Sequence, residues 1–141
     1  MSRVLRTTAA GAVAFASVAA TAFAHGPTEG VKLSAVGSSR VSGLATAGQR
    51  GKGTRVVFTV RGLQPGAKVR AVMQAGTCAK PGASFATAGK ATANASGVAR
   101  WSADVLFHGM PVAWSTISDG AHHFSIVGVG RLACGVVPGM S

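Results

Sequence analysis

Tyrosine is absent from this chain of 141 residues, and acidic residues are few. Only Glu29, Asp104 and Asp119 oppose fourteen lysines and arginines. Aromatic residues make up 6% of the sequence, so the positive charge lacks the row of stacking side chains that binds single-stranded nucleic acid. The charges are also scattered singly along the chain instead of being gathered into a basic run. We therefore expect no nucleic-acid partner.

Long apolar runs are scarce as well. The clearest one, residues 9–20, is too short to span a bilayer and follows the positive charges of Arg3 and Arg6. Small residues then occupy the two positions that signal peptidase reads in Ala22-Phe23-Ala24. This pattern predicts a cleavable secretory signal peptide over residues 1–24.

Cleavage after Ala24 would leave a mature chain over residues 25–141 with a net charge of +9 and no second long apolar run. We expect no membrane span in it and a periplasmic or extracellular location. In such an oxidising compartment the only two cysteines, Cys78 and Cys134, are expected to pair, with two buried thiols as the alternative. Closing a loop of this length would stabilise the fold by about 4 kcal/mol.

Helical periodicity is missing, whereas apolar residues alternate with polar ones. In residues 54–61, Val56, Phe58 and Val60 are expected to face the core, and the residues between them the other side. Residues 67–75 alternate in the same way, with Val69, Ala71 and Met73 opposed to Lys68, Arg70 and Gln74. Further strands are expected at residues 31–36, 41–45, 90–93, 98–105, 113–117, 122–127 and 132–137. Short turns between these segments predict an all-β antiparallel sandwich or barrel without helices, with a loose arm at residues 25–30 and a long loop at residues 78–89.

Four segments occur in an order that is similar to one known family. Gly130-Arg131-Leu132-Ala133-Cys134-Gly135-Val136-Val137 resembles the C-terminal signature of Cu/Zn superoxide dismutase, with its arginine and one disulfide cysteine. The segment from Gly89 to Ala99 resembles that family's strand, turn and strand after the zinc loop. The turn Gly62–Gly66 resembles the one before its copper-binding strand, and Cys78 stands where the other disulfide cysteine is expected. The resemblance implies a Greek-key β-sandwich or flattened barrel of about eight antiparallel strands over residues 25–141.

The same resemblance indicates that the metal ligands have been lost. The family holds copper and zinc with six histidines and an aspartate, but this chain has only four histidines. Ala71 and Met73 fall at the positions of two copper ligands and Gly128 at a third, while residues 78–89 contain no His or Asp. We therefore expect no cofactor and no dismutase activity. Without copper, Arg131 is interpreted as a loop-anchoring arginine in preference to a vestigial anion site.

Weak candidates for a rearranged metal site remain. They are His25, His108, His122, His123 and Met73. Cleavage before His25 would free an α-amine beside its imidazole, a pair that can chelate Cu(II). His122 and His123 are adjacent on a predicted strand and should point to opposite faces, so they cannot hold one metal together.

The expected function is therefore that of a secreted, non-catalytic binding or structural module. Its positive charge fits an anionic polymer of the cell envelope, and another protein is the second partner considered. The alternative is a divergent superoxide dismutase or copper-handling protein that uses copper at a rearranged metal site.

Overall fold

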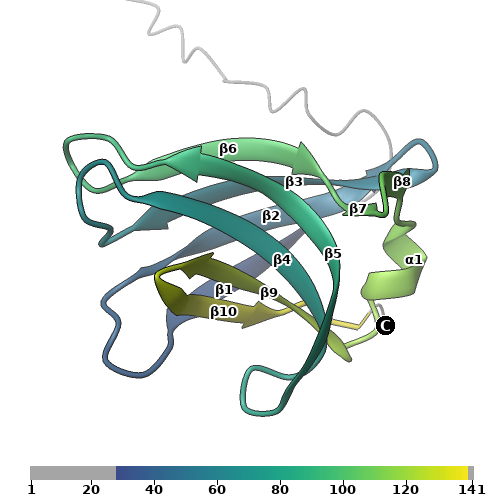
Figure 1. The fold of residues 1–141 in the computed structure, drawn as a ribbon. Helices are drawn as coiled ribbons and strands as arrows, with labels where there is room; N and C mark the ends of the chain where they lie inside the picture. Colours follow the sequence, from purple (N-terminus) through teal and green to yellow (C-terminus); the bar gives the residue numbers. More distant parts are fainter. Residues whose placement is uncertain (1–27, 140–141) are drawn as a thin grey trace, which may run out of the picture.

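A computed structural model describes residues 28–139, which form an almost entirely β structure (Figure 1). The predicted signal peptide, its cleavage position and His25 lie outside the described residues. None of the described helical segments is long and apolar enough to cross a bilayer.

The described residues contain ten antiparallel strands in one sheet that is nearly closed into a barrel. The order in the sheet is β6-β3-β2-β1-β10-β9-β4-β5-β7-β8. The strands are β1 (Thr28–Ala35), β2 (Ser42–Arg50), β3 (Gly53–Arg61), β4 (Lys68–Gly76), β5 (Pro81–Thr92), β6 (Ala99–Asp104), β7 (Leu106–Phe107), β8 (Met110–Pro111), β9 (His122–Gly128) and β10 (Gly130–Val136).

The alternation predicted for β3 is confirmed. Val56, Phe58 and Val60 are fully buried, and Phe58 stacks on Trp101 with ring centroids 4.7 Å apart. Phe124 of β9 meets the same ring edge-on at 5.4 Å. One hydrophobic core therefore fills the space inside the curved sheet.

The barrel closes between β5 and β6, where no strand ladder joins the two. The indole Nε1 of Trp101 donates to the carbonyl oxygen of Ala88 at 3.0 Å. Gly89 adopts a φ of +77°, and a Cβ there would lie 2.7 Å from the Cβ of Ala103, so a side chain has no room. Trp101 and Gly89 thus bring the two edges together.

The disulfide Cys78–Cys134 is confirmed. It ties the turn between β4 and β5 to β10, strands that are not neighbours in the sheet. In β9 and β10 the predicted strands at 122–127 and 132–137 are found with small shifts at their ends.

The predicted strand at residues 113–117 is wrong, because Trp114–Ile117 form the one-turn helix α1. Trp114 and Ile117 are three residues apart and both buried, which suits one face of a helical turn and not the alternation of a strand. The hydroxyl and the backbone N–H of Ser118 both donate to the carbonyl of Trp114 and end the turn.

The predicted loop at residues 78–89 is correct for residues 78–80 and wrong from residue 81 onward, because β5 begins at Pro81 and pairs along β4. Proline is tolerated at the first residue of a strand, where its missing N–H costs no ladder bond. The loose arm predicted at residues 25–30 is wrong for residues 28–30, which pair with residues 46–48 of β2. Two short strands, β7 and β8, were not predicted, since two residues are too few to show alternation.

Candidate functional site

A groove lined by positive charges crosses the outer face of β4, β5 and β9. Lys68 and Arg70 lie two residues apart on β4, so both side chains leave the same face. Lys90 of β5 stands directly opposite Arg70 in the register. The groove has a volume of about 490 Å³, and the rest of its lining is Val69, Ala91, Thr92, Val127 and Gly128.

An irregularity in β5 places Lys90 on this face. Along β4, Arg70 and Val72 are two residues apart, whereas their partners Lys90 and Thr87 are three apart. The extra residue is a β-bulge, and it shifts the alternation by one position. Ala86 and Ala88 face the core, so uninterrupted alternation would have directed Lys90 inward.

No carboxylate neutralises the groove among residues 28–139. Asp104 pairs with Arg55 at 3.2 Å, Asp119 contacts His122, and Glu29 lies on β1. Like charges directly opposite on neighbouring strands repel and destabilise the sheet. An anion held between Arg70 and Lys90 would remove that repulsion, so the arrangement favours a negatively charged ligand.

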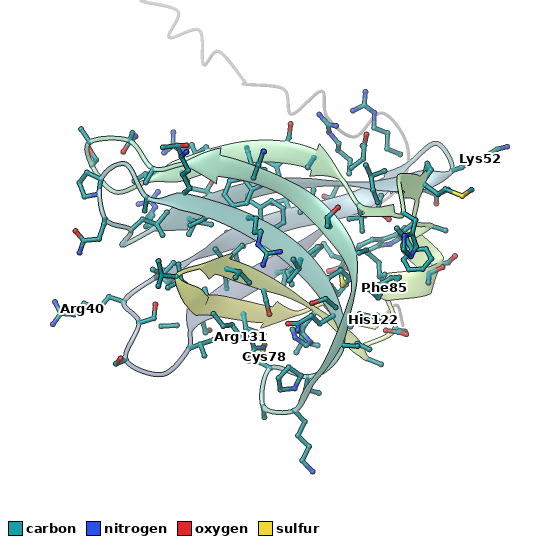
Figure 2. The ribbon with its side chains drawn as sticks, viewed as in Figure 1. Arg40, Lys52, Cys78, Phe85, His122 and Arg131 are labelled. Atoms are coloured by element: carbon teal, nitrogen blue, oxygen red, sulfur yellow. A yellow bond between two sulfur atoms is a disulfide. The ribbon has the colours of Figure 1, made fainter. Side chains whose placement is uncertain are left out.

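A second hollow adjoins the groove and continues the positive surface. It has a volume of about 430 Å³ and shares Lys68, Val69 and Gly128 with the groove. Arg40, in the turn between β1 and β2, is among its lining residues, and Figure 2 shows that its side chain extends outward from the barrel. The cations Lys90, Arg70, Lys68 and Arg40 therefore border one continuous track, which suits an extended ligand better than a single small ion.

A separate polar network lies on the outer face beside the disulfide. Arg131 donates through Nη1 to the carbonyl of Cys78 at 3.1 Å, through Nη2 to Cys134 Sγ at 3.0 Å, and through Nε to Ser125 Oγ at 3.0 Å (Figure 2). The Ser125 hydroxyl in turn donates to Gln74 Oε1 at 2.6 Å. All three nitrogens of Arg131 thus bind protein groups, which makes it a loop-anchoring arginine in this geometry.

His123 completes the network and is fully buried. His123 Nε2 lies 3.3 Å from Arg131 Nη2, a donor, and 3.1 Å from Gln74 Oε1, an acceptor. Nδ1 lies 2.9 Å from the carbonyl oxygen of Gly76, which can only accept, so Nδ1 carries a proton and donates to it. Burial lowers the pKa of His123, and the nearby charges of Arg131 and His122 act in the same direction. The imidazole is therefore held neutral.

We predict that the protein loses stability as the pH falls below about 6.5, the ordinary pKa of histidine. Between that value and the lowered pKa of folded His123, the unfolded chain binds more protons, so acid favours unfolding. Thermal unfolding at pH 7.5 and pH 5 should show this fall for the wild type and a smaller one for His123→Asn. An equal pH dependence in both proteins would contradict the assignment.

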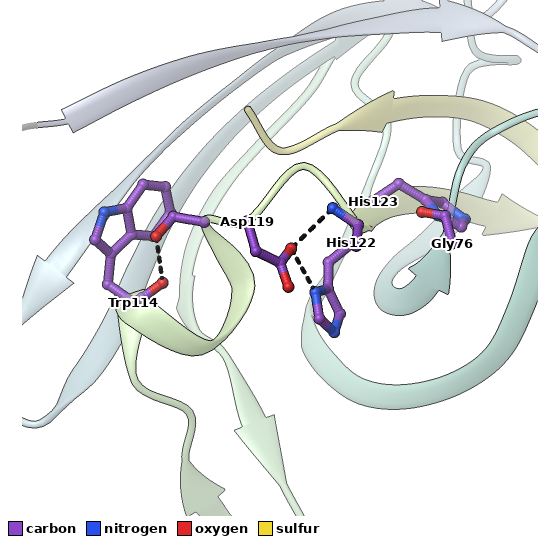
Figure 3. Close-up of polar contacts among 7 residues, drawn as sticks. Gly76, Trp114, Asp119, His122 and His123 are labelled. Carbon is purple, nitrogen blue, oxygen red and sulfur yellow. Dashed lines mark hydrogen bonds and ion pairs between the residues drawn. The ribbon is translucent and has the colours of Figure 1, made fainter. Parts of the chain in front are cut away.

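His122 and His123 point in different directions, as predicted from their adjacency (Figure 3). His122 Nδ1 lies 2.9 Å from Asp119 Oδ1, and this hydrogen bond lowers the pKa of the aspartate. His108 lies in the turn between β7 and β8. No three His, Cys, Asp or Glu side chains within residues 28–139 are grouped closely enough to hold a metal.

Met73 and Ala71, the positions that the resemblance equates with two copper ligands, are both buried in the hydrophobic core. Both side chains face away from the outer surface on which Arg131 lies, and Ala71 has no atom that could coordinate a metal. These residues do not fit the copper site that the resemblance implies. Gly128, which the resemblance equates with a third copper ligand, has no side chain and lines the groove.

Alternation along residues 67–75 already placed Lys68, Arg70 and Gln74 on one face. Lys90 could not be added from the sequence, because the strand containing it was predicted to begin only at residue 90. Its position opposite Arg70 depends on the bulge and on long-range pairing. The role of Ser125 could not be predicted from the sequence, because a single serine in an apolar strand belongs to no recognisable motif.

Comparison of the chain with models of known protein families gives no match, and comparison with curated proteins gives none either. The groove and its charges are therefore the observations on which a functional proposal depends.

Proposed function

We propose that this protein is an exported, non-catalytic module that binds an anionic polymer along the groove of Lys68, Arg70 and Lys90. The observation that carries the proposal is the register of Arg70 opposite Lys90 in a groove without a carboxylate. The adjoining hollow with Arg40 extends the same track, as a polymer would require. The disulfide supports export, because such bonds persist in oxidising compartments.

We also propose that the scaffold is a Cu/Zn superoxide dismutase-like Greek-key barrel whose metal ligands have been replaced. The pairing of Cys78 with Cys134 and the contact of Arg131 with both cysteines support this relationship. Ala71 and Met73 are buried in the core, so neither presents a copper ligand on the outer face beside Arg131. Metal analysis of the exported protein tests the alternative, since stoichiometric copper with superoxide consumption would favour a divergent dismutase.

The groove is tested by the triple variant Lys68→Gln, Arg70→Gln, Lys90→Gln. A matched control removes the same charge from residues that do not line the groove or the hollows beside it, with Lys32→Gln, Arg50→Gln and Lys52→Gln, all exposed residues of β1, β2 and the turn after β2. Calorimetric titration at 50 mM salt would use two probes, polygalacturonate and long-chain polyphosphate.

We expect the groove variant to bind both polymers about 30-fold more weakly than the wild type, taking roughly 0.7 kcal/mol for each exposed ionic contact. The control should lose much less affinity. If the two triple variants weaken binding equally, net charge alone attracts the polymer and the groove has no special role.

A further inference from the structure

A third hollow lies next to the groove and adds an aromatic surface to it. It has a volume of about 380 Å³ and shares Arg70 with the groove. Phe85 and His108 line it, and the exposed hydroxyl-bearing residues Ser84 and Thr87 stand on β5 beside them. The remaining lining is Val72, Ala86, Leu106 and Gly109.

Phe85 is half-buried: its side chain packs against the hydrophobic core and contacts two aromatic neighbours, and it also lines the hollow. Its ring centroid is 5.9 Å from that of Phe107 and 5.4 Å from that of His122, which lies beside it in Figure 2. The ring thus borders the hollow in a fixed orientation. A fixed aromatic ring beside hydroxyl groups and a guanidinium presents apolar, hydrogen-bonding and cationic surfaces within one small space.

His108 lies at the edge of this hollow in a strained backbone conformation. It is the one non-glycine residue within residues 28–139 with a positive φ, +48°, and Gly109 follows at +77°. These two residues form the turn between β7 and β8. In two-residue turns of this kind, asparagine followed by glycine adopts the positive φ angles with less strain than histidine followed by glycine. The histidine therefore lowers stability at this position, and strain retained at a hollow points to a role in binding.

We propose that this hollow receives a sugar ring, so that the polymer bound by the protein is an acidic polysaccharide. This inference depends on the proposed function of the groove. A pyranose ring has an apolar face that packs on Phe85 and hydroxyls that reach Ser84, Thr87 and His108. Its carboxylate or sulfate group lies within reach of Arg70, the residue common to both hollows.

Other polyanions match these surfaces less well. A polyphosphate has no apolar face to cover Phe85. Single-stranded nucleic acid stacks its bases on successive exposed aromatic rings, whereas Phe85 is the only phenylalanine, tryptophan or tyrosine that lines this hollow.

The test compares Phe85→Leu and His108→Asn with the wild type against polygalacturonate, polyphosphate and a thymidine oligonucleotide. Both variants should bind polygalacturonate about 10-fold more weakly and polyphosphate with unchanged affinity. His108→Asn should also raise the melting temperature, because the strain at φ +48° is relieved. Higher stability with lower affinity distinguishes a binding role from a structural one. Leu44→Ala, on the exposed face of β2, is the control and should change neither affinity.

Unchanged polygalacturonate binding in both variants would overturn the sugar subsite, whereas the groove proposal would stand as long as the triple variant still weakens binding. Tighter binding of the oligonucleotide that is lost in Phe85→Leu would overturn it in favour of nucleic acid. Absence of binding to every polymer by the wild type would contradict the groove and the sugar subsite together.

Discussion

Replacing Phe58 with alanine is expected to lower the free energy of unfolding by about 4 kcal/mol, within the range for large buried aromatic residues. Phe58 is fully buried and contacts Trp101 and Phe124 through its two ring interactions. Removing it opens a cavity at the centre of the core. It also removes the support of Trp101, whose indole joins β6 to β5 through Ala88.

Chemical denaturation of the Phe58→Ala variant measures this loss. The matched control is Phe107→Ala, because the Phe107 side chain is 45% exposed and its removal leaves no cavity in the core. The control should lose less than about 1 kcal/mol, as surface substitutions do. Similar losses in the two variants would show that the core does not depend on the Phe58 ring.

Removing the disulfide should destabilise the protein by about 4 kcal/mol on the chain-entropy account of cross-links. Cys78 and Cys134 are separated by 56 positions, so the bond restricts a large part of the unfolded chain. It also holds the turn after β4 against β10, where Arg131 binds the Cys78 carbonyl. The loss thus acts both through the unfolded chain and through a local contact network.

The variant Cys78→Ala, Cys134→Ser is suited to this measurement, because a serine oxygen retains an acceptor for Arg131 Nη2. Its free energy of unfolding should match that of the wild type in a strong reductant. Reductant should leave the variant itself unchanged. A reduced wild type as stable as the oxidised one would contradict the prediction.

The sequence predicted those strands whose alternation is long and regular. In β3, three buried apolar residues alternate with polar or half-exposed ones over nine positions, which only a strand with one buried face explains. Prediction from the sequence failed where the pattern of apolar and polar residues is short or ambiguous. Trp114 and Ile117 lie within a segment of β-branched and aromatic residues, and only their packing on the core selects a helical turn.

The missed part of β5 shows a different difficulty. Its first third, Pro81 to Ser84, contains proline, glycine and serine, which are typical of turns, and all four residues are exposed. Their extended conformation depends on hydrogen bonding to β4, which is a long-range contact that composition does not reveal. The disulfide, in contrast, was predictable because the chain has only two cysteines.

By itself the sequence determined the β class and the excess of positive charge, because these follow from alternation and from counts; it predicted the pairing of Cys78 with Cys134, with two buried thiols as the alternative, and the structure contains that bond. Only the tertiary structure decided where that charge gathers. The bulge beside Gly89 shifts the alternation of β5 by one residue and brings Lys90 to the outer face opposite Arg70. Side chains alternate with a period of two, so one extra residue decides whether Lys90 faces the core or the solvent, and therefore whether it lines the groove beside Arg70.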